Sequence, residues 1–249
     1  MPALILLIDA DDTLLDFKKA EYTSITHTVK KFGVTDLGGA ARLFSAINKA
    51  CWLDVERGVR TREQIAVDRF CELKEKLELS AAPEVINEDY KENMRHAYFL
   101  LPGAEEFLQA LKARRHRLFM ITNGLETTQK MRLKGSGIYG CFENIFISEA
   151  MGLRKPEREY FDKVASLIPS FDKSKCLVIG DSLSADIKGA NNAGLDSIWF
   201  NVEGKPLKEG VFPTYTAHSY SDILAVLDGL QYSRFHAIIL ICKQQSPEF

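Results

Sequence analysis

The sequence lacks the features that mark thiolate metal sites, secreted scaffolds and membrane proteins. Its five cysteines are scattered, and no two form a C-x-x-C pair, which argues against a zinc site or a disulfide framework. The first apolar run, Leu4–Ile8, is too short for a signal-peptide core and leads into acidic residues. The late run Ala237–Cys242 is far shorter than a membrane span. We therefore expect a cytoplasmic protein without a membrane partner.

The chain also has no excess of positive charge. Its 32 lysines and arginines are matched by 34 acidic residues, for a formal net charge of −2. This balance lacks the basic footprint of proteins that bind nucleic acid polymers. Hydrophobic residues make up 46% of 249 residues, enough for a sizeable core. The composition is that of an ordinary soluble protein, and we expect a monomer or a weak homo-oligomer.

Short apolar runs without alternation divide the chain, a pattern typical of parallel strands buried on both faces. They are Leu4–Ile8, Leu118–Ile121, Ile145–Ile147, Leu177–Ile179 and Ile198–Phe200. Helical patterns lie between them: one covers 103–113, one begins with Pro156 in its first turn, and one runs from Ser184 to a stop at Gly194. Alternating strands and helices predict an α/β fold with a doubly wound parallel sheet.

The stretch between the first two strands is too long for a simple crossover and carries only helical signals. Thr61 and Gln64 form a capping-box pattern, and Phe70, Leu73 and Leu77 continue one apolar stripe. We predict an inserted all-α cap domain at 16–97, a core domain at 1–15 and 98–230, and a C-terminal tail of unclear role at 231–249. The cap should pivot on its two connections, 13–17 and 98–103.

Polar residues that suit phosphate chemistry follow the predicted strands. Parallel strands present their carboxyl ends at one edge of a sheet, where open α/β folds bind ligands. We therefore expect these residues to meet: Asp9, Asp11 and Thr13 after the first strand, Thr122 and Asn123 after the second, Lys155 after the third, and Asp181 and Asp186 after the fourth.

This set is chemically coherent, although each member alone has an ordinary explanation as a turn, cap or surface residue. Asp9, Asp11 and Asp181 offer hard oxygen ligands for Mg²⁺. Lys155 and the Thr122 hydroxyl suit phosphate oxygens. One carboxylate can act as a nucleophile, and a second can serve as general acid and base. The pattern favours a magnesium-dependent phosphoryl-transfer enzyme.

The order of these motifs resembles that of the haloacid dehalogenase-like hydrolases with a helical cap. The stretch from Asp9 to Leu14 is similar to the family's first motif, D-x-D-x-T-L, and Thr122, Lys155 and Gly180-Asp181 match the later ones. The resemblance covers about residues 3–228 and implies roles for the site. Asp9 would be the nucleophile and Asp11 the general acid and base. Thr122, Asn123 and Lys155 would bind the phosphoryl group. Asp9, Asp181 and the Asp11 backbone carbonyl would ligate Mg²⁺, with Asp186 and Thr13 in support.

A closer resemblance concerns the substrate. Several stretches are similar to those of bacterial pyrimidine 5′-nucleotidases. In the core they are Thr122-Asn123-Gly124, Gln129, Arg132-Leu133 and 145–149, and in the cap they are 52–58, 61–63 and 69–70. This implies hydrolysis of nucleoside monophosphates. Asp11 disfavours the dehalogenating branch of the family, which lacks that second acid. A phosphosugar phosphatase or mutase with the same core stays open. A non-catalytic phosphate-binding regulatory module is disfavoured by the chain length and the cap.

Overall fold

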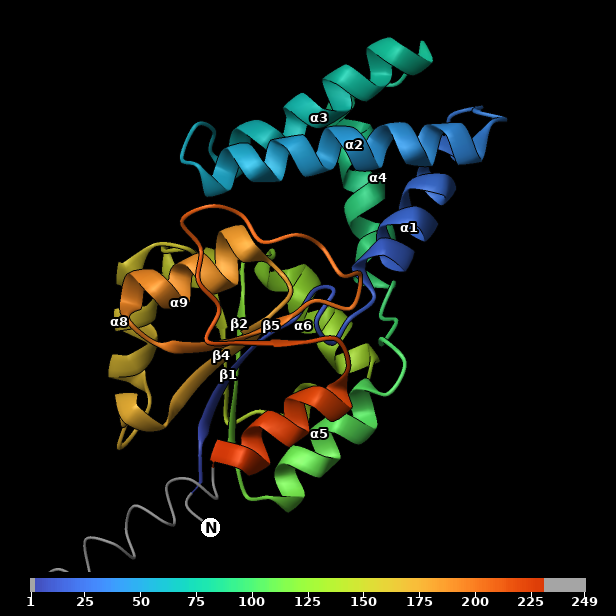
Figure 1. Cartoon of the computed structure of the whole chain (residues 1–249). Helices are drawn as coiled ribbons and strands as arrows, with labels where there is room; N and C mark the ends of the chain where they lie inside the picture. Colours follow the sequence, from blue (N-terminus) through green and yellow to red (C-terminus); the bar gives the residue numbers. More distant parts are fainter. Residues whose placement is uncertain (1–2, 231–249) are drawn as a thin grey trace, which may run out of the picture.

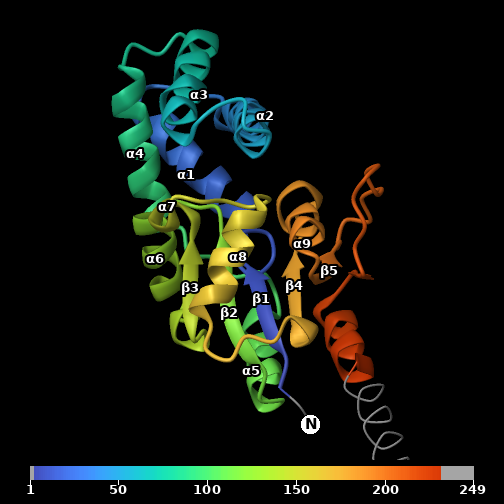
Figure 2. The ribbon, with the colours of Figure 1, turned by 90° about the vertical axis from the view of Figure 1, so that its left-hand side faces the viewer.

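The computed structural model describes residues 3–230, which form a six-stranded sheet beneath a helical insertion (Figures 1 and 2). The strand order is β3-β2-β1-β4-β5-β6, and all neighbours pair in parallel. The bounds are β1 Ile5–Asp9, β2 Arg117–Thr122, β3 Asn144–Ile147, β4 Cys176–Gly180, β5 Asp196–Phe200 and β6 Tyr215–Ala217. The predicted α/β fold with a doubly wound parallel sheet is confirmed. The central strand β1 reverses the strand order, so its carboxyl end lies at the switch point.

Both faces of the sheet are covered by helices, which explains why the strands read as continuous apolar runs. The bounds are α5 Ala104–Ala113, α6 Glu126–Gly135, α7 Ser148–Met151, α8 Arg158–Leu167 and α9 Lys188–Ala193. Leu6 and Ile8 of β1 share a core with Phe107 of α5. Ile5 and Leu7 point to the other face, where they join the core of α8 and α9. Alternate side chains of one strand therefore fill two separate hydrophobic layers.

Three details differ from the sequence-based expectations. Pro156 precedes α8 instead of lying in its first turn, because Glu157 is the N-cap residue. The helix expected from Ser184 begins earlier, with a π-helical turn Leu183–Ile187 after the N-cap Ser182, and then continues as α9 to Gly194. Strand β6 was not predicted, because its three residues do not form an apolar run.

The insertion consists of four helices that follow β1 (Figure 1). Their bounds are α1 Phe17–Lys31, α2 Leu37–Glu56, α3 Arg62–Leu77 and α4 Pro83–Arg95. They share a hydrophobic core of their own, in which the rings of Phe44 and Phe70 stack and that of Tyr90 packs against both at a tilt. The capping box predicted at Thr61 and Gln64 is present with both hydrogen bonds. An inserted helical cap is thereby confirmed, while its exact bounds at 16 and 97 stay a prediction.

The two connections to the cap are hydrogen bonded to each other. Asp16 N donates to Phe99 O at 2.9 Å, and Leu101 N donates to Leu14 O at 2.9 Å. An isolated bridge also pairs Leu15 with Leu100. The chain therefore enters and leaves the cap through one short paired segment.

Within residues 3–230, no helix is long and apolar enough to cross a membrane. The tail predicted at 231–249 lies outside the described residues.

His116 is a buried imidazole at the start of β2 whose neutral form the fold requires. Its Nδ1 accepts a hydrogen bond from Leu4 N at 3.2 Å. Burial, followed by the charge of Arg114, lowers the pKa of His116 below 6.5, against the opposing charge of Asp228. The unfolded chain therefore binds a proton that the folded chain resists, and stability falls as the pH drops below about 6.5.

We predict that His116→Asn, which keeps an acceptor for Leu4 N, flattens this dependence. Between pH 7 and pH 5, the wild-type Tm should fall faster than that of the variant, by about 2–4 °C per pH unit at most. Thermal unfolding followed by circular dichroism measures this difference. His27→Asn, at an exposed position of α1, serves as the control and should leave the slope unchanged.

Candidate active site

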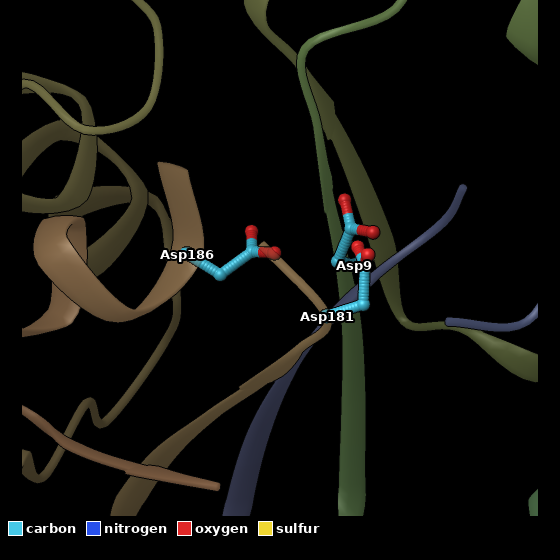
Figure 3. A group of neighbouring side chains, drawn as sticks. All are labelled: Asp9, Asp181 and Asp186. Carbon is cyan, nitrogen blue, oxygen red and sulfur yellow. The ribbon is translucent and has the colours of Figure 1, made fainter. Parts of the chain in front are cut away.

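Three carboxylates converge at the carboxyl end of the sheet (Figure 3). Asp9 ends β1, Asp181 follows β4, and Asp186 lies in the π-helical turn. Each offers an oxygen, and these oxygens lie within 4.8 Å of one another. Residues 172 positions apart in the sequence thus meet because β1 and β4 are neighbours in the sheet. Such a cluster needs a cation.

Lys155 supplies one positive charge to this cluster. Its Nζ donates to Asp9 Oδ1 at 2.6 Å, to Asp186 Oδ1 at 2.7 Å and to Ile121 O at 3.1 Å. The side chain is only 2% exposed. All three hydrogens of the ammonium group therefore have acceptors, as a buried charge requires.

One lysine does not neutralise three acids. Burial raises the pKa of Asp9 to about 7, against the attraction of Lys155, and the charge of Asp186 raises it further. Burial also raises the pKa of Asp181 well above its ordinary value, with the charges of Asp9 and Asp186 adding to the effect. Burial opposes the charge on Lys155, but Asp186 and Asp9 outweigh it and raise its pKa. The site is short of positive charge, a deficit that a divalent cation would fill.

The donor set fits Mg²⁺. It contains carboxylate oxygens from Asp9, Asp181 and Asp186, while histidine and cysteine take no part in this cluster of described residues. Hard oxygen ligands on fixed elements suit Mg²⁺ better than zinc or copper. The metal assignment of Asp9 and Asp181 from the sequence is compatible with this geometry. The structure adds Asp186 to the same cluster.

The backbone around Asp181 and Asp186 is fixed by specific contacts. Asp181 N donates to Thr13 Oγ1 at 3.1 Å, and its carbonyl oxygen accepts from Trp199 Nε1 at 2.9 Å. Gly180 allows Asp186 to approach, because a Cβ atom at position 180 would lie 2.3 Å from Asp186 Oδ2. Thr13, predicted as a supporting residue, thus orients the loop that carries Asp181.

Thr122 and Asn123 lie beside this cluster but make different contacts. The Thr122 hydroxyl accepts from Gly124 N at 3.2 Å and from Gln129 Nε2 at 2.8 Å, so its own hydrogen can face a further acceptor. The Asn123 side-chain amide forms two hydrogen bonds with the Lys155 backbone. It accepts from the Lys155 N–H at 3.0 Å and donates to the Lys155 carbonyl oxygen at 2.9 Å. Asn123 positions Lys155, and its predicted contact with a phosphoryl group stays a prediction.

Asp11 lies two residues beyond Asp9, but its carboxylate lies outside the three-acid cluster. It accepts from Arg132 Nη1 at 2.5 Å and from Gln129 Nε2 at 2.8 Å. Directly after Asp11 the chain turns, and Asp12 has a positive φ of 56°. Asp9 and Asp11 therefore have separate surroundings, as two carboxylates with different tasks need.

Side chains of the cap contact the core above the site. Arg62 Nη2 donates to Ser148 Oγ at 2.6 Å. Glu56, at the end of α2, lies near Ser184 and is within electrostatic range of Asp186 and Lys155. Burial raises the pKa of Glu56, with the Ser184 hydrogen bond opposing the shift. The insertion thus supplies groups to the mouth of the site.

The structure brings together Asp9, Lys155, Asp181 and Asp186, and places Asp11, Thr13, Thr122 and Asn123 directly around them. The sequence singled out Gln129 and Arg132 only through the resemblance to nucleotidases and predicted no contact for them, and Trp199 was missed altogether. The signal for the first two was their spacing of three positions on a helix with few apolar residues, which puts both on one face.

Comparisons with known proteins define the class. The haloacid dehalogenase-like hydrolase family matches residues 4–194, so the chain belongs to this family. It is 36% identical over 223 residues to the pyrimidine 5′-nucleotidase PynA of Streptococcus pneumoniae, covering 90% of this chain and 94% of that protein. It is 31% identical over 222 residues to the pyrimidine 5′-nucleotidase YjjG of Escherichia coli, covering 89% and 96%.

A solved structure extends the comparison. The crystal structure of the HAD-hydrolase YfnB from Bacillus subtilis, bound to magnesium and described as revealing interdomain movement, superposes with a TM-score of 0.86 at 33% identity. The match covers 91% of this chain and 99% of that one, so it includes the cap as well as the core.

We predict that Gly180→Ala weakens Mg²⁺ binding by about ten- to a hundredfold, because the new methyl group displaces the Asp186 carboxylate. Isothermal titration calorimetry with MgCl₂ measures the affinity. Gly140→Ala is the matched control, because a Cβ atom there meets nothing within 4 Å. Equal affinities for the wild type and Gly180→Ala would show that Asp186 does not contribute to the metal site.

Proposed function

We propose that this protein is a magnesium-dependent phosphomonoester hydrolase that acts through an aspartyl-phosphate on Asp9. The observation that carries the proposal is the pairing of two differently held carboxylates. Asp9 lies in the cation-binding cluster, whereas Asp11 lies just outside it on donors from α6. A nucleophile beside a metal and a separate acid and base are the parts that hydrolysis through a covalent intermediate requires.

In the first step, an Asp9 carboxylate oxygen forms a bond to phosphorus while the bond from phosphorus to the leaving oxygen breaks. Asp11 donates a proton to that leaving oxygen, and the substrate alcohol departs. Lys155 favours the ionised form of Asp9 and orients its carboxylate through a 2.6 Å hydrogen bond. The Thr122 hydroxyl donates to a phosphoryl oxygen.

In the second step, Asp11 takes a proton from water, whose oxygen bonds to phosphorus as the bond from phosphorus to Asp9 breaks. Inorganic phosphate leaves and Asp9 is regenerated. A magnesium ion held by Asp9, Asp181 and the Asp11 backbone carbonyl, with Asp186 beside it, would neutralise charge on the phosphoryl oxygens.

Asp11 also favours phosphate over halide as the leaving group. A departing alkoxide needs a proton, whereas a departing halide does not. An enzyme that displaced halide would have no use for a second carboxylate two residues from the nucleophile. The side chain of Asp11 is 29% exposed, so a leaving group can reach its carboxylate.

We further propose that the substrates are nucleoside monophosphates. Support comes from the relatives of similar length that are named pyrimidine 5′-nucleotidases. The relevant selectivity would come from cap groups such as Arg62 and Glu56, which lie against the core near the site. The core residues handle only the phosphoryl group and serve any phosphomonoester alike.

We predict phosphate release from pyrimidine nucleoside 5′-monophosphates in the presence of Mg²⁺, and none with excess chelator. A panel of nucleotides and hexose phosphates, assayed for free phosphate, measures this. Asp9→Asn should abolish turnover with its fold intact, because an amide is not a competent nucleophile. Turnover confined to hexose phosphates, or isomerisation without phosphate release, would instead indicate a phosphosugar phosphatase or mutase.

We predict that Asp11→Asn slows hydrolysis of an alkyl phosphate on the order of a hundredfold, because the alkoxide then leaves without a proton. An aryl phosphate such as p-nitrophenyl phosphate should lose less than about tenfold, since its leaving group is stable as an anion. Comparing kcat/KM for the two substrates tests this, because kcat/KM reports the step that forms the aspartyl-phosphate and excludes the later attack of water. An equal loss on both would contradict the acid role of Asp11.

A further inference from the structure

Each carboxylate oxygen of Asp11 is held by a separate donor from helix α6. Oδ1 accepts from Arg132 Nη1 at 2.5 Å, and Oδ2 accepts from Gln129 Nε2 at 2.8 Å. Two donors on different oxygens fix both the position of the carboxylate and its rotation about the last side-chain bond. The carboxylate that has to meet the leaving oxygen is therefore pre-oriented by α6.

Arg132 is a buried cation that donates hydrogen bonds both to Asp11 and to the backbone of Ala97. Its side chain is 1% exposed. Besides Asp11, it donates through Nη1 to Gln129 Oε1 at 3.0 Å and through Nε to Ala97 O at 3.1 Å. Ala97 lies just beyond α4, where the chain leaves the cap. A guanidinium buried this deeply needs a counter-ion, and Asp11 is the carboxylate that pairs with it.

Gln129 completes the arrangement on the other side. Its amide nitrogen donates to both Asp11 and the Thr122 hydroxyl, while its oxygen accepts from Arg132. Position 124 has to be glycine for this side chain to fit, because a Cβ atom there would lie 2.5 Å from Gln129 Cγ. The network thus joins the acid, the phosphate-binding hydroxyl and the cap connection.

We propose that Arg132 is a positioning residue that acts through Asp11 and couples that carboxylate to the second connection of the cap. This inference rests on the proposed phosphatase activity. Asp11 has to reach the leaving oxygen in the first step and water in the second, and both depend on where its carboxylate is held. Because Arg132 also binds the Ala97 carbonyl, a shift of residues 97–101 moves the guanidinium and with it the acid.

The test combines Arg132→Met with the leaving-group comparison. The variant should lower kcat/KM for a nucleoside monophosphate at least about tenfold, because kcat/KM reports the step that forms the aspartyl-phosphate and a mispositioned acid transfers its proton poorly. On p-nitrophenyl phosphate, kcat/KM should change less than about threefold, because that leaving group needs no proton. Lys130→Met is the matched control on α6, since Lys130 is exposed and pairs with Glu126. It should leave the ratio of the two rates unchanged.

A double-mutant cycle separates positioning from a structural role. In an Asp11→Asn background, Arg132→Met should cause less than about a twofold further change on either substrate, because its effect is transmitted through Asp11. A loss of similar size with and without Asp11, or on both substrates alike, would overturn the proposal. If Arg132→Met does not fold, Arg132→Lys replaces it. This variant keeps a charge but lacks the planar group that reaches Asp11 and Ala97 together, so the same selective loss is expected.

Hydrogen exchange tests the coupling to the cap. Asp11→Asn should change amide exchange in residues 97–101 when Arg132 is present, and should leave it unchanged in an Arg132→Met background. An equal change in both backgrounds would show that the two sites are coupled by another route. Failure of the activity itself is distinguishable, because the wild type would then release phosphate from neither substrate.

Discussion

The ion pairs of Lys155 with Asp9 and Asp186 are the constraint on which the rest of the site depends. Three acids at the end of a buried sheet repel one another, and a single ammonium group holds two of them in place. Several of the surrounding groups accordingly fix the position of Lys155. The Asn123 side chain accepts from the Lys155 N–H and donates to the Lys155 carbonyl oxygen. The Ile121 carbonyl oxygen accepts the third hydrogen bond of the Lys155 ammonium group. A site held in this way is rigid and remains short of positive charge until a divalent cation binds.

The core of the fold and the location of the site were predictable from the sequence for one physical reason. Parallel strands buried on both faces appear as apolar runs, and their carboxyl ends share one edge, so residues such as Asp9, Thr122 and Asp181 meet whatever the helices do. Local backbone geometry was less predictable. Before α8, the backbone of Lys155 is hydrogen bonded to the Asn123 side chain. The helix begins only after the N-cap residue Glu157, so Pro156 lies outside it.

The hydrogen-bond partners of Asp11 could not be predicted from the sequence. Its partner Arg132 is a fully buried cation on a helix with no clear apolar stripe, where a charged residue is ordinarily expected to face solvent. Only the three-dimensional approach of α6 to the end of β1 makes the pairing evident.

The paired connections of the cap have a consequence for how such a protein can diversify. Because Asp16 bonds to Phe99 and Leu14 bonds to Leu101, the chain leaves the core and returns to it at almost the same point. Replacing the whole helical segment would leave two ends already side by side, so the core would not have to adjust to a cap of another size. New selectivity can therefore be acquired by exchanging a module, while the phosphoryl-transfer machinery stays as it is.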